Sequence, residues 1–298
     1  MNEKEQEWQE SRAKGIGGSE AAAILGLSKW KTPYQVWQDK RGLSGERETS
    51  EAMEWGTILE PVIRQKYSDV TGRIVRLPGH LQDAEHSFML GTLDGITDDQ
   101  RVLEVKTSRS LQDWGEPGTD EIPMVYLIQV QHYMRITGLT VADVAVLLAG
   151  SDFRIYEVPA DKELQDMLVE REYEFWNLVQ TGIPPEPISY ADAVKRYRTS
   201  TSKAVTASPA SVAAFEALKA IKEQYKVIEQ SEEAAKTIIM KELAEADTLL
   251  ALDGTPIVTW KQSKESQRFD AKAFQAEHPE LYKQYLKTIE GSRRFLLK

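Results

Sequence analysis

The sequence of 298 residues predicts an α+β fold, in which a mixed sheet is flanked by helices and followed by an appended helical and hairpin region. Three strand patterns rich in alternating and β-branched residues cover 73–77, 86–96 and 101–107. Helical spacing of apolar residues occurs on both sides of these strands. After a polar stretch, a long pattern near coiled-coil spacing begins at Ser208-Pro209.

Composition excludes several kinds of chemistry. The chain has no cysteine, which excludes disulfides, thiolate zinc sites, Cys-bound iron–sulfur clusters and a cysteine nucleophile. Hydrophobic residues make up 41% and charged residues 28%, as in soluble globular proteins, and no apolar run is long enough to cross a membrane. Because the first ten residues are too polar for a signal peptide, we expect a cytoplasmic protein with no membrane partner.

The net charge of −10 argues against a nucleic-acid partner, but only weakly. Carboxylates gathered at a metal site add to the negative charge, and phosphates need only a local basic path. Basic residues that form such a path, or else a solvated scatter of surface charge, occur early in the chain at Arg12, Lys14, Lys29, Lys31, Lys40 and Arg41.

The first two helices are marked by their caps. Ser19 follows a glycine-rich approach and is expected to cap a short helix that stops at Gly26. The free N–H groups at that helix start could seat a phosphate, or Ser19 could act as a cap alone. Thr32-Pro33 opens the second helix, which runs to Gly42.

The third helical pattern covers about 51–71 and carries an acidic residue at a proline. Glu60 directly precedes Pro61, which should bend the helix or start a new one. A carboxylate at such a break is either solvated surface or aimed into a site.

The remainder of the first domain alternates helix and hairpin. A helical pattern ends at Gly138, a hairpin covers 141–159, and a further helix over 161–181 ends before the prolines at 184–187. We therefore expect a first domain over 1–190, a linker over 191–207 and a C-terminal region over 208–298. The long helix in that last region is either continuous or broken near Gln230-Ser231, and a hairpin turning at Asp253-Gly254 follows it.

Three charged residues near the centre of the first domain indicate metal-dependent chemistry. Asp94 lies in a glycine-flanked turn, and Glu104 and Lys106 follow on a strand whose alternation places these two side chains on one face. Hard carboxylate oxygens suit Mg²⁺ or Mn²⁺, and an ammonium group beside them could position or deprotonate an attacking water. By itself the pattern is also compatible with a solvated strand.

Further motifs in the same order strengthen this interpretation. They are R-x₆-S at Arg12 and Ser19, S-E-A-A-A-I-L-G, W-G-T-I-L-E-P ending near Glu60, G-T-L-D-G with Asp94, L-E-V-K with Glu104 and Lys106, and Y-L-I-Q-V-Q at 126–131. Together these motifs resemble the YqaJ-type viral recombination nucleases, relatives of lambda exonuclease with the PD-(D/E)xK, restriction-endonuclease-like fold.

The resemblance implies a role for each matching residue. Asp94, Glu104 and the backbone carbonyl of Val105 would bind Mg²⁺, or Mn²⁺, while Glu60 would serve a second ion. Lys106 would orient the water, as a base only if its pKa is lowered.

Residues of the helical motif and of the N-terminal motif have supporting roles by the same resemblance. Gln129 would steady Lys106 or the scissile phosphate, with Gln131 and Tyr126 as secondary candidates. Arg12 and Ser19 would hold the 5′-terminal phosphate of the DNA.

The resemblance also implies an activity and its partners. Relatives degrade one strand of double-stranded DNA from its 5′ end and pass the exposed strand to a single-strand annealing protein, and lambda exonuclease is a ring-shaped trimer. We expect the same here, in a bacterial host carrying a phage or prophage, although the region after about residue 200 puts the trimer in doubt. The alternatives are an endonuclease or flap nuclease of this fold, or a non-catalytic DNA- or partner-binding scaffold.

Overall fold

The structure is a computed structural model that describes residues 14–45, 50–288 and 291–297. The chain divides into two compact units, Met1–Tyr197 and Arg198–Lys298. Within the described ranges, no helix has both the length and the apolar character needed to cross a membrane.

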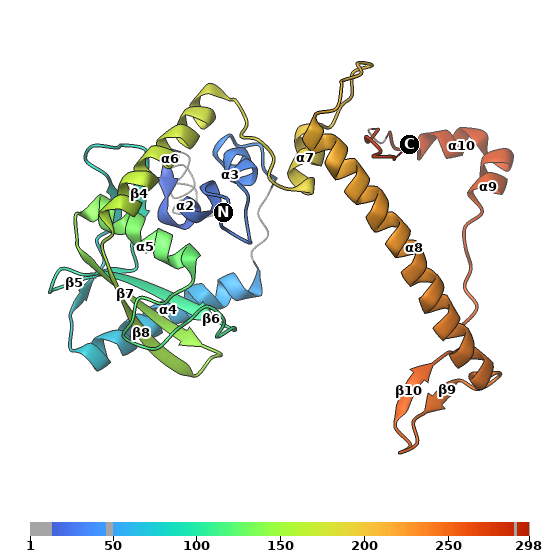
Figure 1. Ribbon diagram of the computed structural model, residues 1–298, viewed down its shortest axis with the longest axis horizontal. Coiled ribbons are helices and arrows are strands. Elements are labelled where there is room, and N and C mark those ends of the chain that lie inside the picture. The colour runs from blue at the N-terminus through green and yellow to red at the C-terminus, as the bar shows by residue number, and fades with distance from the viewer. Residues whose placement is uncertain (1–13, 46–49, 289–290, 298) are drawn as a thin grey trace. The chain divides into compact units, whose positions relative to one another are not determined.

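The first unit is built on a five-stranded mixed sheet with strand order β2-β5-β6-β7-β8 (Figure 1). β6 and β7 pair in parallel, as expected where a helix connects them, and the other neighbours are antiparallel. The strands are β2 (Val75–Arg76), β5 (Gly95–Thr97), β6 (Val102–Ser108), β7 (Val141–Leu148) and β8 (Asp152–Pro159).

A smaller sheet corrects the predicted strand over 86–96. The chain there forms two strands, β4 (Met89–Thr92) and β5, which belong to different sheets. β4 lies between β1 (Ile16–Gly17), which runs parallel to it, and β3 (His80–Gln82), which the sequence analysis did not predict. The sheets separate at Leu93-Asp94, so Asp94 lies at a junction between two sheets rather than within a strand.

Helices cover both faces of the large sheet. On one face α4 (Glu51–Thr71) packs Ile63 and Tyr67 against Leu103 and Val105 of β6. On the other face α5 (Met124–Thr137) contributes Val130, Tyr133 and Met134 to a core that includes Val102, Val144 and Val146. The predicted alternation of β6 is thereby confirmed, because Leu103 and Val105 pack on α4 while Glu104 is bonded to α5. α4 continues through Pro61 as one helix, so of the two predicted alternatives, a bend or a new start, the new start is excluded.

Four further helices occur among the described residues of the first unit. Their bounds are α2 (Gly18–Ile24), α3 (Pro33–Lys40), α6 (Lys162–Thr181) and α7 (Tyr190–Arg196). Thr32 caps α3 by accepting the Gln35 N–H at 3.2 Å, as predicted. Part of the expected linker over 191–207 is instead the helix α7, which Ser189 caps at 3.1 Å and which lies in the first unit.

The start of α2 differs from the prediction. Ser19 lies inside the helix, Gly17 is the N-cap, and the carboxylate of Glu20 accepts the Gly17 N–H at 3.0 Å. Tertiary packing sets this start, because a Cβ at Gly18 would lie 2.5 Å from the Tyr133 ring. The glycines therefore permit a close approach of α2 to α5, which local capping preferences do not register.

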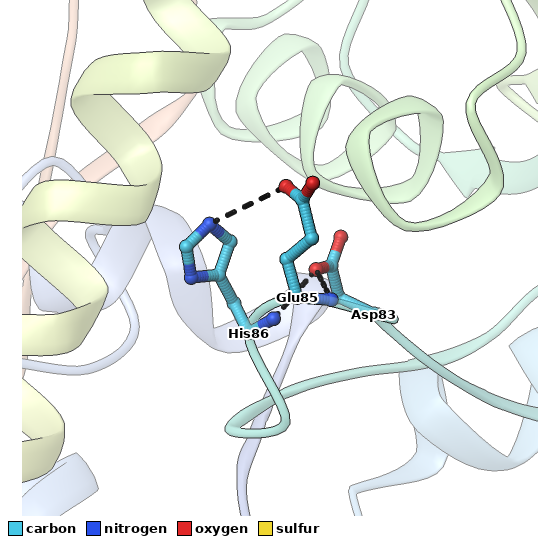
Figure 2. Close-up of side chains that lie close together, drawn as sticks. All are labelled: Asp83, Glu85 and His86. Carbon is cyan, nitrogen blue, oxygen red and sulfur yellow. Dashed lines mark hydrogen bonds and ion pairs between the residues drawn. The ribbon is translucent and has the colours of Figure 1, made fainter.

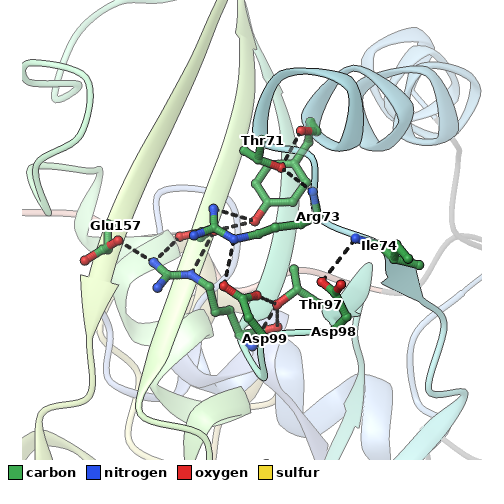
Figure 3. A network of polar contacts seen from close by, with 10 residues as sticks. Thr71, Arg73, Ile74, Thr97, Asp98, Asp99 and Glu157 are labelled. Carbon is green, nitrogen blue, oxygen red and sulfur yellow. Dashed lines mark hydrogen bonds and ion pairs between the residues drawn. The ribbon is translucent and has the colours of Figure 1, made fainter.

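One end of the large sheet is fixed by a polar network around Asp143 of β7. Figure 3 labels Arg73, Asp99 and Glu157 among the residues of the network. Arg101 donates to both oxygens of the buried Asp143 carboxylate, at 2.7 and 3.0 Å. Arg73 donates to the same group at 3.3 Å, and the Tyr67 hydroxyl also bonds to it. Because these residues come from α4, β7 and the turns beside them, the Asp143 network ties the helix to the sheet.

The second unit contains one long helix and several short elements. α8 (Pro209–Leu243) is continuous through Gln230-Ser231 and, with 35 residues, is about 52 Å long at about 1.5 Å per residue. The predicted hairpin is present as β9 (Thr248–Leu250) and β10 (Pro256–Thr259), with Gly254 at φ 85° in its turn. α9 (Ala271–Glu277), capped by Asp270, and α10 (Pro279–Gln284) follow.

Candidate metal centre

Asp94 is positioned by the end of the ladder between β5 and β6. The two strands pair only at Gly95 with Leu103 and at Ile96 with Val102. Beyond that point the Val105 N–H has no strand partner on this side, and the Asp94 carboxylate accepts it at 2.7 Å. The side chain of Asp94 therefore takes the place of a strand neighbour and points at β6 beside Glu104.

Glu104 of β6 is buried and only partly bonded. Its Oε1 accepts the Gln129 amide at 2.7 Å and an ion pair from Lys106. Its Oε2 is buried and has no hydrogen-bond partner among the described residues. A buried carboxylate oxygen without a partner is costly unless something compensates it, and a divalent cation is the kind of group that would.

Glu60 of α4 completes a set of three acids, which we call the acidic cluster: Glu60, Asp94 and Glu104. The guanidinium of Arg64 joins two of them, donating to Glu60 Oε1 at 2.9 Å and to the Asp94 carbonyl at 3.1 Å. The negative charge of Glu60 also raises the pKa of both Asp94 and Glu104. The fold thus brings the three predicted acids to one region.

Crowding of like charges is visible in the protonation behaviour of the cluster. Burial, followed by the negative charge of Glu104, raises the pKa of Asp94 well above its ordinary value. Burial also raises the pKa of Glu104, although Lys106 opposes the rise. The cluster therefore holds more negative charge than its neighbours compensate, which is the electrostatic condition for binding a cation.

Lys106 remains a cation in this arrangement. Burial by itself would lower the pKa of Lys106, but the charges of Glu104 and Asp94 outweigh burial and the net shift is upward. The ammonium group also lies 5.1 Å from the centre of the Tyr126 ring, within the range of a cation–π contact. The lowered pKa that a general base would need is absent here, so the geometry favours electrostatic positioning by Lys106.

Gln129 holds Glu104 beside Lys106. Its side-chain amide donates to Glu104 and, at 3.1 Å, to the Tyr133 hydroxyl. Lys106 pairs with the same Glu104 oxygen, and the predicted support of Lys106 or of the scissile phosphate by Gln129 stays a prediction. Tyr133, one helical turn after Gln129, was missed in the sequence, although an i, i+4 search from Gln129 would have found it. Arg64, four residues after Glu60, was also not predicted as a site residue, although the same i, i+4 search from Glu60 would have found it.

Ser19 lines a pocket that is linked to the acidic cluster through side-chain contacts. The pocket has a volume of about 210 Å³ and is lined by Gly17, Gly18, Ser19, His80, Leu90, Gly91, Thr92 and Tyr133. Tyr133 is shared with Gln129, so the pocket is connected to Glu104 through two side chains. Arg12, the predicted partner of Ser19, lies outside the described residues.

Two other predictions are corrected by the geometry. Gln131 is buried away from the cluster, where it donates to the Pro159 carbonyl at 2.8 Å and accepts the Asp161 N–H at 2.9 Å. Residues two positions apart on a helix point in different directions, so Gln129 and Gln131 do not both reach one site. Of the early basic residues, Lys40 is buried in an ion pair with Glu20 at 2.6 Å and so is not part of a surface path.

His132 supports the pocket wall from the interior. Its Nε2 lies 3.0 Å from the Leu90 carbonyl and its Nδ1 lies 2.8 Å from Glu172, and both side chains are fully buried. Since both ring nitrogens face acceptors, the ring is suited to be doubly protonated. Although burial lowers the pKa of His132, Glu172 outweighs this effect and raises it.

A second group of possible ligands lies away from the cluster. Asp83, Glu85 and His86 place ligand atoms within 4.8 Å of one another, and no other such trio occurs in the described part of the chain (Figure 2). Arg135 pairs with Glu85 at 2.6 Å, and Asp83 accepts the N–H groups of Glu85 and His86 at 2.9 and 2.8 Å. These contacts account for the group as a charged turn, so we assign no ion to it. The carboxylates of the acidic cluster are more widely spaced, because Arg64 holds Glu60 while Lys106 and Gln129 hold Glu104.

Comparison with known proteins agrees with this arrangement. Residues 7–140 match the YqaJ-like viral recombinase domain. The chain is 33% identical over 305 residues to the uncharacterized protein YqaJ of Bacillus subtilis (strain 168), covering 98% of this chain and 93% of the relative. The chain belongs to the YqaJ family.

The fold of this family member is that of lambda-exonuclease-like, restriction-endonuclease-like nucleases. The crystal structure of an alkaline exonuclease, LHK-Exo, from Laribacter hongkongensis is similar to it with a TM-score of 0.51 and 22% identity. The similarity covers 60% of this chain and 94% of that one. The predicted fold class is thereby confirmed.

Proposed function

We propose that the protein is a metal-dependent deoxyribonuclease that degrades one strand of double-stranded DNA from its 5′ end in the 5′→3′ direction. The observation that carries the proposal is the acidic cluster, in which the buried Glu104 Oε2 lacks a partner within the described part of the chain while Lys106 bonds to the other oxygen of the same carboxylate. Membership of a viral recombinase family supports a reaction on DNA.

Oxygen donors define the ion that the cluster fits. Asp94 and Glu104, with the carbonyl of Val105, would hold Mg²⁺ or Mn²⁺, because both ions prefer carboxylate and carbonyl ligands. Glu60 would serve a second ion. Bound divalent ions supply Lewis-acid stabilisation of the negative charge that develops in phosphodiester hydrolysis.

The remaining residues act on the substrate and on the acids. Lys106, held as a cation by Glu104, orients the attacking water and the phosphate oxygens. Gln129 keeps the Glu104 carboxylate turned toward the site. Ser19 and Arg12 bind the 5′-terminal phosphate, for which the Ser19 pocket has room.

The biological setting that we propose rests on the resemblance to this family. The first unit carries the reaction and works on DNA ends in the cytoplasm of a bacterial host with a phage or prophage. A single-strand annealing protein receives the exposed strand. The protein acts as a homo-oligomer, a trimer by analogy with lambda exonuclease.

Digestion of end-labelled linear duplex DNA tests the proposal. With Mg²⁺, a 5′-phosphorylated duplex should be degraded from its 5′ ends faster than a 5′-hydroxyl duplex, and a closed circle should stay intact. Cleavage of the circle would identify an endonuclease instead. Binding of DNA without any Mg²⁺- or Mn²⁺-dependent cleavage would identify a scaffold.

A further inference from the structure

A row of aromatic side chains runs from the core of the first unit to its surface beside Lys106. It begins at the buried Tyr156 of β8, whose ring centre lies 5.2 Å from that of Trp114. Trp114 lies 5.6 Å from Tyr126, and Tyr126 lies 6.4 Å from Trp30. All three separations are within the range of direct aromatic contact.

The inner part of this row is fixed. Tyr156 is fully buried and its hydroxyl donates to the Gly115 carbonyl at 2.8 Å, while Trp114 is only 8% exposed. Tyr126, on α5, is half-buried and covers the ammonium group of Lys106. Trp30, the outermost ring, therefore contacts a ring that is itself packed against the core.

The outer end of the row is open. Trp30 lies in the loop between α2 and α3 and is 60% exposed. This exposure is high for tryptophan, a large side chain that is mostly buried on average. The Trp30 and Lys31 N–H groups lie 3.2 and 3.4 Å from Ser28 Oγ, so a local turn holds the loop. The exposed Lys29 places its ammonium group 5.1 Å from the centre of the Trp30 ring.

The exposed ring of Trp30 has a cation, Lys29, beside it, and Tyr126 connects it to Lys106. This combination fits an unpaired nucleotide. Proteins hold unpaired bases by stacking them on exposed aromatic rings and by pairing the adjacent phosphates with basic residues. A ring that served only to cover Tyr126 would be buried by that contact, whereas most of Trp30 is not. Trp30 and Lys106 both contact the single ring of Tyr126, at 6.4 and 5.1 Å, so a group stacked on Trp30 would lie near the reacting phosphate.

We infer that Trp30 is a substrate-binding residue on which a base next to the scissile phosphate stacks, with Lys29 contacting the neighbouring phosphate. This inference rests on the proposed function and adds to it the group that holds the unpaired end of the strand being degraded.

Steady-state kinetics on a 5′-phosphorylated linear duplex with Mg²⁺ test this role. Trp30→Ala should raise KM roughly 5- to 150-fold, which corresponds to one stacked base, with a smaller change in kcat. Trp30→Phe and Trp30→Tyr should recover most of the loss, and Trp30→Leu should not, because stacking needs a ring while covering Tyr126 needs only apolar bulk. The matched control is Tyr173→Ala, since Tyr173 is 55% exposed but contacts Phe88, and it should leave KM unchanged.

A binding readout separates this inference from the proposed function. Duplexes carrying 2-aminopurine at the first or second nucleotide of the 5′-ended strand are mixed with Lys106→Ala protein, and quenching reports stacking. Quenching should disappear when Trp30→Ala is added to Lys106→Ala. Failure of the wild-type protein to digest any duplex would overturn the proposed function, whereas normal digestion with an unchanged KM in Trp30→Ala, or full recovery by Trp30→Leu, would overturn the role of Trp30 alone.

Discussion

Two buried carboxylates of the same sheet, Asp143 of β7 and Glu104 of β6, differ in how their charge is compensated. The Asp143 carboxylate receives two arginines and a tyrosine hydroxyl, and each of its oxygens has a donor. In the acidic cluster three carboxylates share Lys106 and Arg64, and Glu104 Oε2 has no partner among the described residues. The charge and hydrogen-bonding capacity of Asp143 are satisfied by its own neighbours, whereas the acidic cluster needs additional positive charge.

The contrast shows how buried acids with different roles can be told apart. Both groups cost desolvation, and both contain residues with raised pKa values, so burial alone does not separate them. What separates them is whether the surrounding donors and cations match the number of carboxylate oxygens. On this reasoning the Asp143 network stabilises the fold, and the acidic cluster serves a bound cation.

Removal of the Lys106 ammonium group beside the acidic cluster should have the largest effect on the rate of DNA degradation. Lys106→Ala should lower the rate of duplex degradation roughly 10²- to 10⁴-fold, because Lys106 stabilises charge where the reaction occurs. The fold should persist, since Glu104 keeps its bond to Gln129 and its raised pKa lets it take up a proton. Rates and thermal unfolding are measured on the same preparation, and near-normal cleavage would contradict the role of Lys106.

Removal of charge from the Asp143 network should act on stability instead. Asp143→Asn should lower the free energy of unfolding by about 3–5 kcal/mol, because Arg101 and Arg73 lose the carboxylate that they share. Asp152→Asn is the matched control, since its pair with Arg154 is exposed to solvent and should contribute far less. Urea unfolding measures both, and equal losses in the two variants would show that the network has no special weight.

Divalent ions should distinguish the two groups directly. Mg²⁺ or Mn²⁺ at 100 times its Kd should stabilise the wild-type protein by about 2.7 kcal/mol, because the folded state alone has the site. Asp94→Asn and Glu104→Gln should lose this gain, while Asp143→Asn should keep it from a lower starting point. Thermal unfolding with and without the ion gives the comparison, and an equal gain in Asp94→Asn would place the ion elsewhere.

The smallest expected effect is a difference in pH dependence without divalent ions. The raised pKa of Asp94 means that its contribution to stability is fully present below its unfolded value of about 3.9 and is lost as pH rises through the folded value. Asp94→Asn removes this loss and retains an acceptor for the Val105 N–H. Urea unfolding in EDTA from pH 5 to 8 should therefore favour the variant increasingly, and a pH-independent difference would contradict the charge crowding.

Sequence patterns predicted the elements that local chemistry determines. The caps of α3 and α9, the left-handed Gly138 after α5 and the hairpin at Asp253-Gly254 follow from residue types within a few positions. The motif order likewise identified the acids that the fold brings together. Element boundaries that depend on tertiary contact were not predictable, as at Gly18, where the Tyr133 ring sets the start of α2.

Details of the site required the structure because they concern direction. Gln129 and Gln131 are equivalent in the sequence, and only the packing of α5 turns the first toward Glu104 and the second toward Pro159. Lys40 is of a residue type that usually lies at the surface, but it forms a buried ion pair with Glu20. The exposure of Trp30 beside Tyr126 has no sequence signal that separates it from an ordinary core tryptophan.

Diffraction from crystals soaked in Mn²⁺ tests the central claim most directly, because the anomalous signal locates the ion without reference to activity. The account predicts a peak bonded to Asp94 and Glu104, with the previously unpartnered Glu104 Oε2 as a ligand. A peak at Asp83, Glu85 and His86 with nothing at Asp94 and Glu104 would contradict it.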